Sequence, residues 1–542
     1  MADRYSKDKD YKVVTVIILT AYRGKEDRPY QLEASIGIYT DRIQSNSLDV
    51  FIKKADALMY QTSYSIKIVE KMNRLLKIMK SFAGLKQKYI GDRAFYKRYL
   101  LLAVPMIVQN AITNLVSFLD NIMVGQLGTE QMSGVAIVNQ LIFVYNLAIF
   151  GAVSAASIFG AQYFGKGNHK GHMYSFRFKL YATLLVTGLT VFLFVTKGEG
   201  LISLYLTDTV GNGATELALQ YGKRYLVIMM AGLIPFAVNQ AYATNIKETG
   251  QTFVPMIASF AAVGANAVLD YLLIFGIGPF PELGVEGAAL ATVFSRYLEA
   301  LIVIFWAHMH RQKNCYLEGA YAGFGIPVGE LKAILIKGSP LMLNEVLWAA
   351  GMTTVTQCYS VRGLDVVAGL NIATTITNLF NIVYLQLGAC ISIVVGQYLG
   401  AGELEEAKDA DNKMIVFSVF CCVIMASIMF AAGRFFPQIY NTSPEIKKLA
   451  ANFIAVSAII MPFCSFSHAS YFTLRSGGKT LVTFLFDSVF TWVVVVPAAY
   501  LLAHFTGLGI VSVYFFVQAT ELIKVVIGYC MVRSNVWVVQ MV

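Results

Sequence analysis

Four acidic residues lie inside long apolar segments of the sequence, where a charged side chain is costly and is therefore a candidate for function. They are Asp120, Asp270, Glu345 and Asp487. A helix rises about 1.5 Å per residue, so Asp120 and Asp270 are expected about 8 and 9 Å below the same boundary of a membrane. Asp487 is expected near the opposite boundary, as the partner of a basic residue in a loop.

Asp120 and Asp270 are expected to share their depth with two neutral polar side chains. Asn266 lies one helical turn from Asp270 on the same face, and Thr292 is expected about 12 Å below the boundary on the next helix. Carboxylate, amide and hydroxyl oxygens suit a hard cation such as Na⁺. Two carboxylates in a dry pocket also repel each other and could hold a proton instead. A structural alternative is that both acids are hydrogen-bonded at the outer interface.

The composition argues against a soluble globular protein. The 542 residues are 56% hydrophobic and 14% charged, and the mean hydropathy is +0.59. The net charge of +10 is typical of Lys and Arg collected in cytoplasmic loops, so no nucleic-acid partner is expected. Most of the cysteines fall inside predicted helices without a C-x-x-C pair, which indicates small buried residues and neither disulfides nor a zinc site.

The apolar periodicity predicts an all-α membrane protein with twelve transmembrane helices in two pseudo-symmetric six-helix bundles, preceded by a small α/β fragment. The predicted spans are 97–123, 131–160, 173–196, 216–243, 252–276, 284–309, 331–357, 367–396, 413–433, 447–473, 480–504 and 509–532.

The two bundles are predicted from an internal repeat. Pro105, Gly134 and Asn146 recur at one constant offset as Pro340, Gly369 and Asn381, and residues 162–167 recur as 397–402. Lys and Arg are concentrated in loops on the side of the N-terminus, which places both termini in the cytoplasm. Six helices per half then give parallel repeats, as in transporters. The predicted domains are 95–312 and 331–542, joined by a cytoplasmic linker at 313–330.

Four prolines lie at matched places in the two halves: Pro105, Pro235, Pro340 and Pro462. Each removes a backbone hydrogen bond and permits a kink, which would suit alternating access, although the helices could also be kinked and rigid.

Residues 1–92 differ from the rest because they are charged and contain no apolar run long enough to cross a bilayer. Strands are predicted at 13–19 and 32–39 and a helix at 48–60. Residues 34–38 and 55–60 resemble the C-terminal part of GGDEF domains, the diguanylate cyclases. The GGDEF turn itself is missing, so residues 1–65 are interpreted as a truncated and inactive fragment. Residues 66–94 are predicted to form a basic amphipathic helix, either on the membrane surface or as a solvated linker.

The membrane part resembles the MATE (multidrug and toxic compound extrusion) antiporters. The resemblance rests on residues 118–125 (FLDNIMVG), 160–165 (GAQYFG), 396–400 (GQYLG), 273–276 (LIFG) and 283–289 (LGVEGAA). It extends over about residues 95–535.

The resemblance implies roles for individual residues. Asp120 matches a first-helix aspartate that binds the coupling cation, Asn266 and Asp270 match an N-x-x-x-D pair, and Thr292 matches a threonine of the same site. Glu345 matches an acid found in one branch of the family. That branch's second acid aligns near Cys464, where this chain has none, and Asp120 falls on Val355 in the repeat. Coupling is therefore expected in the first half, with Glu345 binding substrate or acting structurally.

These features together predict a multidrug efflux antiporter and no enzyme. It would exchange organic cations or amphipathic drugs for Na⁺ or H⁺ without a cofactor, as a monomer in the lipid bilayer of a bacterial inner membrane. One alternative is a lipid-linked precursor flippase of the same superfamily. Another is a membrane-tethered cyclic-dinucleotide signalling protein that uses the N-terminal segment.

Overall fold

The computed structural model of the chain describes residues 12–20, 35–43, 88–206 and 212–542, with the backbone alone at 12–20, 35–43, 116–119, 121 and 212–213. The chain divides into two compact units, Met1–Lys86 and Gln87–Val542.

The described part of the first unit is an antiparallel pair of strands, β1 (Lys12–Thr20) and β2 (Ser35–Ile43). Their register pairs Lys12 with Ile43 and Thr20 with Ser35. The first predicted strand is confirmed, and the second begins and ends a few residues later than predicted. The helix predicted at 48–60, and the linker helix at 66–94 as far as residue 87, lie outside the described residues.

The second unit is helical, and its first half contains seven helices. They are α3 (Arg93–Gly125), α4 (Thr129–Lys166), α5 (His169–Ser203), α6 (Asn212–Ala231), α7 (Leu233–Glu248), α8 (Phe253–Phe275) and α9 (Val285–Met309). A connection that contains the short helix η2 (Cys315–Leu317) leads into the second half.

The second half repeats this plan with more irregularity. Its elements are α10 (Val328–Ser360), α11 (Leu364–Ala401), α12 (Leu404–Ala432), η3 (Phe436–Ile439), α13 (Pro444–Ser476), α14 (Thr480–Phe484), η4 (Leu485–Val489), η5 (Thr491–Val495), α15 (Val496–Phe505), α16 (Ile510–Ala519) and α17 (Glu521–Arg533). The π-helical segments η4 and η5 lie inside the span 480–505, and π turns often occur at functional sites.

The helices agree with the predicted twelve spans. Nine spans in the described part of the chain are long and apolar enough to cross a membrane, and the pair α6–α7, bent by 44°, makes a tenth. Helices α3 and α10, of 33 residues each, are the remaining two. The bend between α6 and α7 precedes Pro235 by a few residues, whereas Pro105, Pro340 and Pro462 lie inside unbroken helices.

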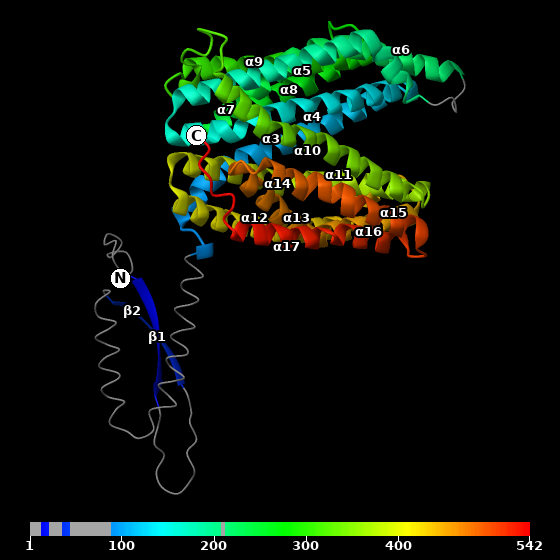
Figure 1. Cartoon of the computed structure of the whole chain (residues 1–542). Helices are drawn as coiled ribbons and strands as arrows, with labels where there is room; N and C mark the ends of the chain where they lie inside the picture. Colours follow the sequence, from blue (N-terminus) through cyan, green and yellow to red (C-terminus); the bar gives the residue numbers. More distant parts are fainter. Residues whose placement is uncertain (1–11, 21–34, 44–87, 207–211) are drawn as a thin grey trace, which may run out of the picture. The chain divides into compact units, whose positions relative to one another are not determined.

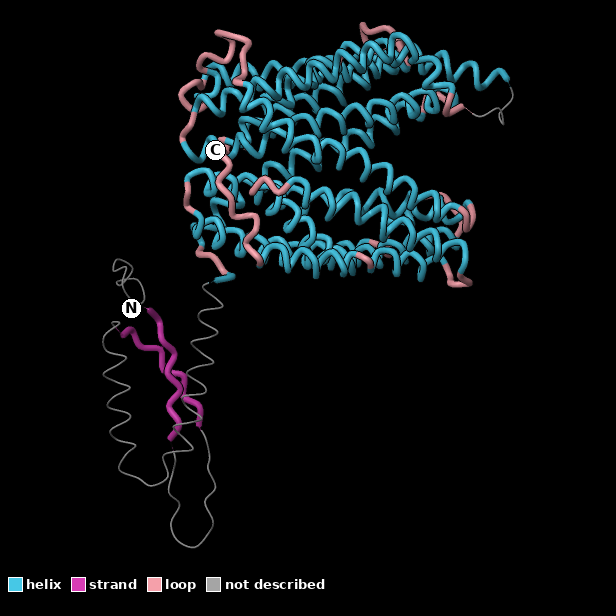
Figure 2. Tube along the Cα trace, in the orientation of Figure 1, coloured by secondary structure: helices cyan, strands magenta, loops and turns pink. Residues whose placement is uncertain are grey.

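The helices form two bundles that touch at one end and diverge toward the other (Figure 1). Each bundle has its own apolar core. A further cluster joins the start of α3, through Tyr99 and Met106, to α11 and to Trp537 near the C-terminus. The beginning of α3 and the end of the chain therefore lie at the same end, which we call the convergent end. The tube in Figure 2 shows this end as the place where helices of both bundles come together.

Two glycines make the crossing of α4 and α11 possible. A Cβ atom added at Gly165 would collide with the carbonyl oxygen of Gln397, and one added at Gly400 would collide with that of Gln162. The backbones thus approach each other more closely than any larger residue allows. The two contacts are reciprocal, because Gly165 and Gln162 occupy the same repeat positions as Gly400 and Gln397.

Candidate functional site

The carboxyl groups of Asp120 on α3 and Asp270 on α8 lie together, as predicted from the sequence. Asp270 is almost fully buried and Asp120 is half-buried. The two side chains lie close enough to interact directly. Two adjacent carboxyl groups repel each other when both are ionised, so this arrangement favours the binding of a proton or of a small cation.

The pair keeps unused binding capacity. The Oδ1 atoms of Asp120 and Asp270 are both buried without a hydrogen-bond partner among the described residues, and so is the amide nitrogen of Asn266. Asn266 is buried one turn below Asp270 on α8. Buried polar atoms normally have partners, so the two carboxylate oxygens are available as ligands for a small hard cation.

Tyr225 on α6 adds a hydroxyl group that the sequence did not point to. Its side chain is buried and lies close enough to Asp120 and Asp270 to feel both charges. The hydroxyl group donates a long hydrogen bond, 3.4 Å, to Oδ1 of Asn139 on α4. Tyr225 follows Lys223 and Arg224 at the start of an apolar run, and this position in the sequence gave no sign that it faces the acids. Only the packing of α6 against α4 and α9 brings it there.

Thr292 is the predicted site residue with the weakest support. It lies half-buried on α9, which packs along α8. In the described part of the chain no hydrogen bond joins Thr292 to Asp120 or Asp270. Its place in the site stays a prediction.

Arg296 and Glu299 on α9 are charged residues within the first bundle that our sequence analysis did not single out. The Arg296 guanidinium feels the charges of Tyr225 and Glu299 and stacks 5.1 Å from the ring centre of Phe236. Glu299 accepts a hydrogen bond from Ser259. Both residues interrupt the apolar segment 285–309, so the rule that identified Asp120 would also have found them.

The prediction for Asp487 was wrong about its partner. Its carboxylate accepts hydrogen bonds from Lys524, at 2.9 Å, and from the Asn344 amide, at 3.1 Å. Lys524 belongs to α17 inside a membrane span and is 8% exposed, so the base is on a helix and not in a loop. A buried base stabilises a buried carboxylate, and Lys524 is the only Lys or Arg between residues 509 and 532.

Glu345 on α10 belongs to the same polar region of the second bundle. It is half-buried and feels the charges of Arg475 and Asp487. The described residues contain no group of three His, Cys, Asp or Glu side chains suited to a metal ion. The acid pair of the first bundle and the acid–base cluster of the second are thus different in chemistry: the first lacks a basic partner in hydrogen-bond contact and the second has one.

Comparison with known proteins agrees with this architecture. The sequence model of the MatE family matches residues 105–272 and 340–501, which are the two halves of the repeat. The chain belongs to the MatE family. The GGDEF resemblance lies outside both matched segments.

Curated relatives and solved structures extend the comparison. The chain is 23% identical over 446 residues to a probable multidrug resistance protein NorM of Thermotoga maritima, covering 81% of this chain and 93% of the relative. It is 24% identical to a probable multidrug resistance protein NorM of Bradyrhizobium diazoefficiens, covering 80% of this chain and 91% of the relative. The fold is similar to that of the MATE transporter VcmN of Vibrio cholerae, with a TM-score of 0.72, 17% identity and coverage of 82% and 98%. The fold is also similar to that of a multidrug resistance MATE family transporter in an outward-facing conformation, with a TM-score of 0.72 and 20% identity. This match covers 83% of this chain and 97% of the other chain.

Proposed function

We propose that this MatE protein exports organic cations and amphipathic drugs in exchange for Na⁺ or H⁺. The observation that carries the proposal is the buried Asp120–Asp270 pair, in which each carboxyl group has an oxygen without a partner in the described residues. The names of the NorM relatives support drug export as the activity. No cofactor is needed, because the ion gradient supplies the free energy.

The charge of the facing helices favours cationic substrates. In the diverging halves of α3, α4, α10 and α11, the acids are Asp120, Glu130, Glu345 and Asp365, and there is no Lys or Arg. Exposed amides and hydroxyls, such as those of Asn114 and Thr374, accompany them. Polar groups avoid lipid, so these side chains belong to the space between the bundles. A surface of acids and amides attracts cations and repels anions.

Coupling requires that the cation prefer one of two conformations. A cation or proton at Asp120 and Asp270 shifts the population only if its affinity differs between them. When neither acid carries a proton, the two adjacent carboxylates repel each other unless Na⁺ bridges them. Either ion therefore changes the force between α3 and α8, and Asn266 and Thr292 would complete the donor set.

Two roles are open to Glu345 in the proposal, substrate binding and a structural role in the second bundle. A carboxylate in the space between the bundles suits a cationic substrate, and its closeness to Arg475 and Asp487 also suits a structural acid of the second bundle. The missing second acid near Cys464 favours the structural role, because a complete cation site would need another carboxylate.

The membrane placement follows from the loop charges. We place the convergent end and both termini in the cytoplasm of a bacterial inner membrane, and the protein acts as a monomer because each chain holds both bundles. Residues 1–65, the truncated GGDEF-like fragment, take no part in transport. The flippase alternative would require an apolar groove, and the polar lining of the facing helices does not favour it.

Ethidium efflux from proteoliposomes tests the proposal. With the purified protein, an imposed Na⁺ gradient or pH gradient should drive ethidium across the membrane, and whichever gradient drives it identifies the coupling ion. Transport that ignores both gradients would contradict the antiporter mechanism.

A further inference from the structure

Two glutamines link the bundles at the convergent end by equivalent hydrogen bonds. Gln162, near the end of α4, donates from Nε2 to the carbonyl oxygen of Ser476 at 2.9 Å. Gln397, near the end of α11, donates from Nε2 to the carbonyl oxygen of Glu248 at 2.8 Å. Each bond runs from one bundle to the other.

The acceptors are equivalent as well as the donors. Glu248 is the last residue of α7 and Ser476 is the last residue of α13. Carbonyl groups at a helix C-terminus have no partner within the helix and are strong acceptors. Each bundle thus offers one glutamine and one free helix end to the other, and Gly165 and Gly400 allow the backbones to come close enough for both bonds.

The segment after α17 adds a third connection on one side only. The Met541 amide donates to Oε1 of Gln162 at 2.8 Å, and Gln162 Nε2 also reaches the Val539 carbonyl at 3.3 Å. The Gln540 side chain donates to the Gly400 carbonyl at 3.0 Å. Trp537 is buried and anchors the segment on the second bundle, while Met541 and Val542 pack on a cluster that includes Ala155 and Phe159 of the first.

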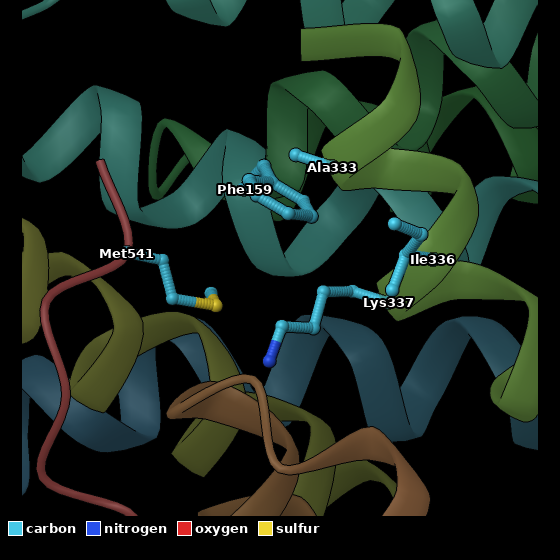
Figure 3. Close-up of a pocket in the computed structure, with 5 residues that line it drawn as sticks. All are labelled: Phe159, Ala333, Ile336, Lys337 and Met541. Atoms are coloured by element: carbon cyan, nitrogen blue, oxygen red, sulfur yellow. The ribbon is translucent and has the colours of Figure 1, made fainter. Parts of the chain in front are cut away.

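A cavity marks the edge of this contact. It measures about 320 Å³ and is lined by Phe159 of α4, by Ala333, Ile336 and Lys337 of α10, and by Met541 (Figure 3). Met541 forms one wall across from α10, so the segment covers the seam without filling it.

We propose that Gln162 and Gln397 are a reciprocal latch that holds the convergent end closed, and that residues 539–542 are an additional arm of this latch. The latch rests on the proposed transport cycle, in which this end must open. Opening separates α4 from α11 and breaks both glutamine bonds together with the arm. The latch therefore sets the balance between the two conformations, and neither glutamine touches substrate or the coupling ion.

A native cysteine reports on the state of the seam. Cys390 on α11 is fully buried against α3, with its thiol donating to the Met106 sulfur at 3.5 Å. Opening of the convergent end would withdraw α3 and expose this thiol. Cys422 on α12 is equally buried, but within the core of the second bundle, so opening should leave it protected.

The test measures alkylation of both cysteines by N-ethylmaleimide in the full-length protein in nanodiscs, with mass spectrometry resolving each site. Gln162→Leu and Gln397→Leu should each raise the rate at Cys390 about tenfold, the effect of losing one to two buried hydrogen bonds. A chain that ends at Val538 should raise it less, and Cys422 should not change. Gln220→Leu, on the exposed surface of α6, is the matched control and should have no effect.

Two outcomes would overturn the latch: an unchanged rate at Cys390, or an equal rise at Cys422, which would indicate general loosening. If a leucine variant fails to fold, Gln162→Asn and Gln397→Asn, which shorten the side chain, take its place with the same expectation. The labelling needs neither drug nor ion gradient. If the alkylation rates change as expected but the protein exports no ethidium, the latch is supported and the transport proposal is refuted. If the protein exports ethidium but the alkylation rates do not change, the transport proposal is supported and the latch is refuted.

Discussion

Asp120 and Asp270 lie together although they belong to different helices, α3 and α8, and each has a buried carboxylate oxygen without a partner among the described residues. Two carboxylates at this distance repel each other, and a bound proton or Na⁺ relieves the repulsion. Substitutions at and around this pair are therefore the most direct tests of coupling.

The Asp120→Asn variant should lose drug efflux while remaining in the membrane. The amide preserves the shape of the side chain but cannot bind or release a cation, so drug efflux in intact cells should fall to that of cells without the protein. Asp409→Asn is a matched control, because Asp409 is exposed near the start of α12, outside the facing helices. Normal efflux by the Asp120 variant would refute its role in coupling.

Removing the hydroxyl group of Tyr225 should weaken cation binding without abolishing transport. A hydrogen bond or dipole near a charged site contributes about 1 kcal/mol, so Tyr225→Phe should raise the half-saturating concentration of the coupling ion about fivefold. The measurement is ethidium efflux from proteoliposomes as a function of ion concentration. Tyr271→Phe serves as the control since Tyr271 follows Asp270 on α8 but is exposed. Equal effects of the two substitutions would contradict the assignment.

The ion pair of Lys524 and Asp487 should matter for stability more than for transport. Lys524→Met leaves a buried carboxylate without its base, which should lower the free energy of unfolding by about 3 kcal/mol. The readout is the midpoint of thermal unfolding in detergent. The exposed pair Lys223–Glu199, at 2.7 Å, gives the comparison, because Lys223→Met should cost less than about 1 kcal/mol. Adding Asp487→Asn to Lys524→Met should recover part of the loss; no recovery would show that the pair is not the cause.

The glycine crossing should tolerate no side chain. Gly165→Ala places a methyl group against the Gln397 carbonyl, and such overpacking costs about 1–3 kcal/mol. We expect slower drug efflux in cells and a higher rate of Cys390 alkylation. At Gly188, in the interior of α5, nothing lies within reach of an added methyl group, so Gly188→Ala should be neutral. Wild-type behaviour of the Gly165 variant would mean that the closed crossing is not required.

Deleting residues 1–86 should leave drug efflux intact, because the membrane unit begins at Gln87 and has its own cores. Efflux per molecule of protein in the membrane is the quantity to compare. A cell that keeps efflux but loses cyclic-dinucleotide signalling would support the rival function for the N-terminal segment.

Spans could be read from the sequence because a bilayer imposes one length and one polarity on every helix. The predicted segment 284–309 and the helix α9, Val285–Met309, nearly coincide. The acid pair was also accessible, since Asp270 and Asn266 share a helical face and Asp120 has a similar depth. Depth and periodicity do not say which helices are neighbours, however, and for this reason the contacts of Tyr225 with the pair and of Lys524 with Asp487 were missed.

The position of the segment after α17 could not be predicted from the sequence either. Residues 534–542 have no periodicity that would indicate a docking partner. Their position is set by Gln162 and by the buried ring of Trp537, which are tertiary contacts. The π-helical segments η4 and η5 also left no sign in an apolar run that reads as a regular helix.

The connection between the halves bears on how such a chain arose. Helix α9 ends and α10 begins at the end where α3 starts and α17 finishes, and Arg177 holds the connection there by donating to the carbonyl groups of Gly319, Ala320 and Gly325. Each half thus begins and ends on the same side of the membrane. Two copies of an ancestral six-helix gene could have been fused by this short connector without inverting either copy. The ancestor would have worked as a homodimer with two identical glutamine bonds, and the lone acid pair and the one-sided C-terminal arm are then the divergence that followed duplication.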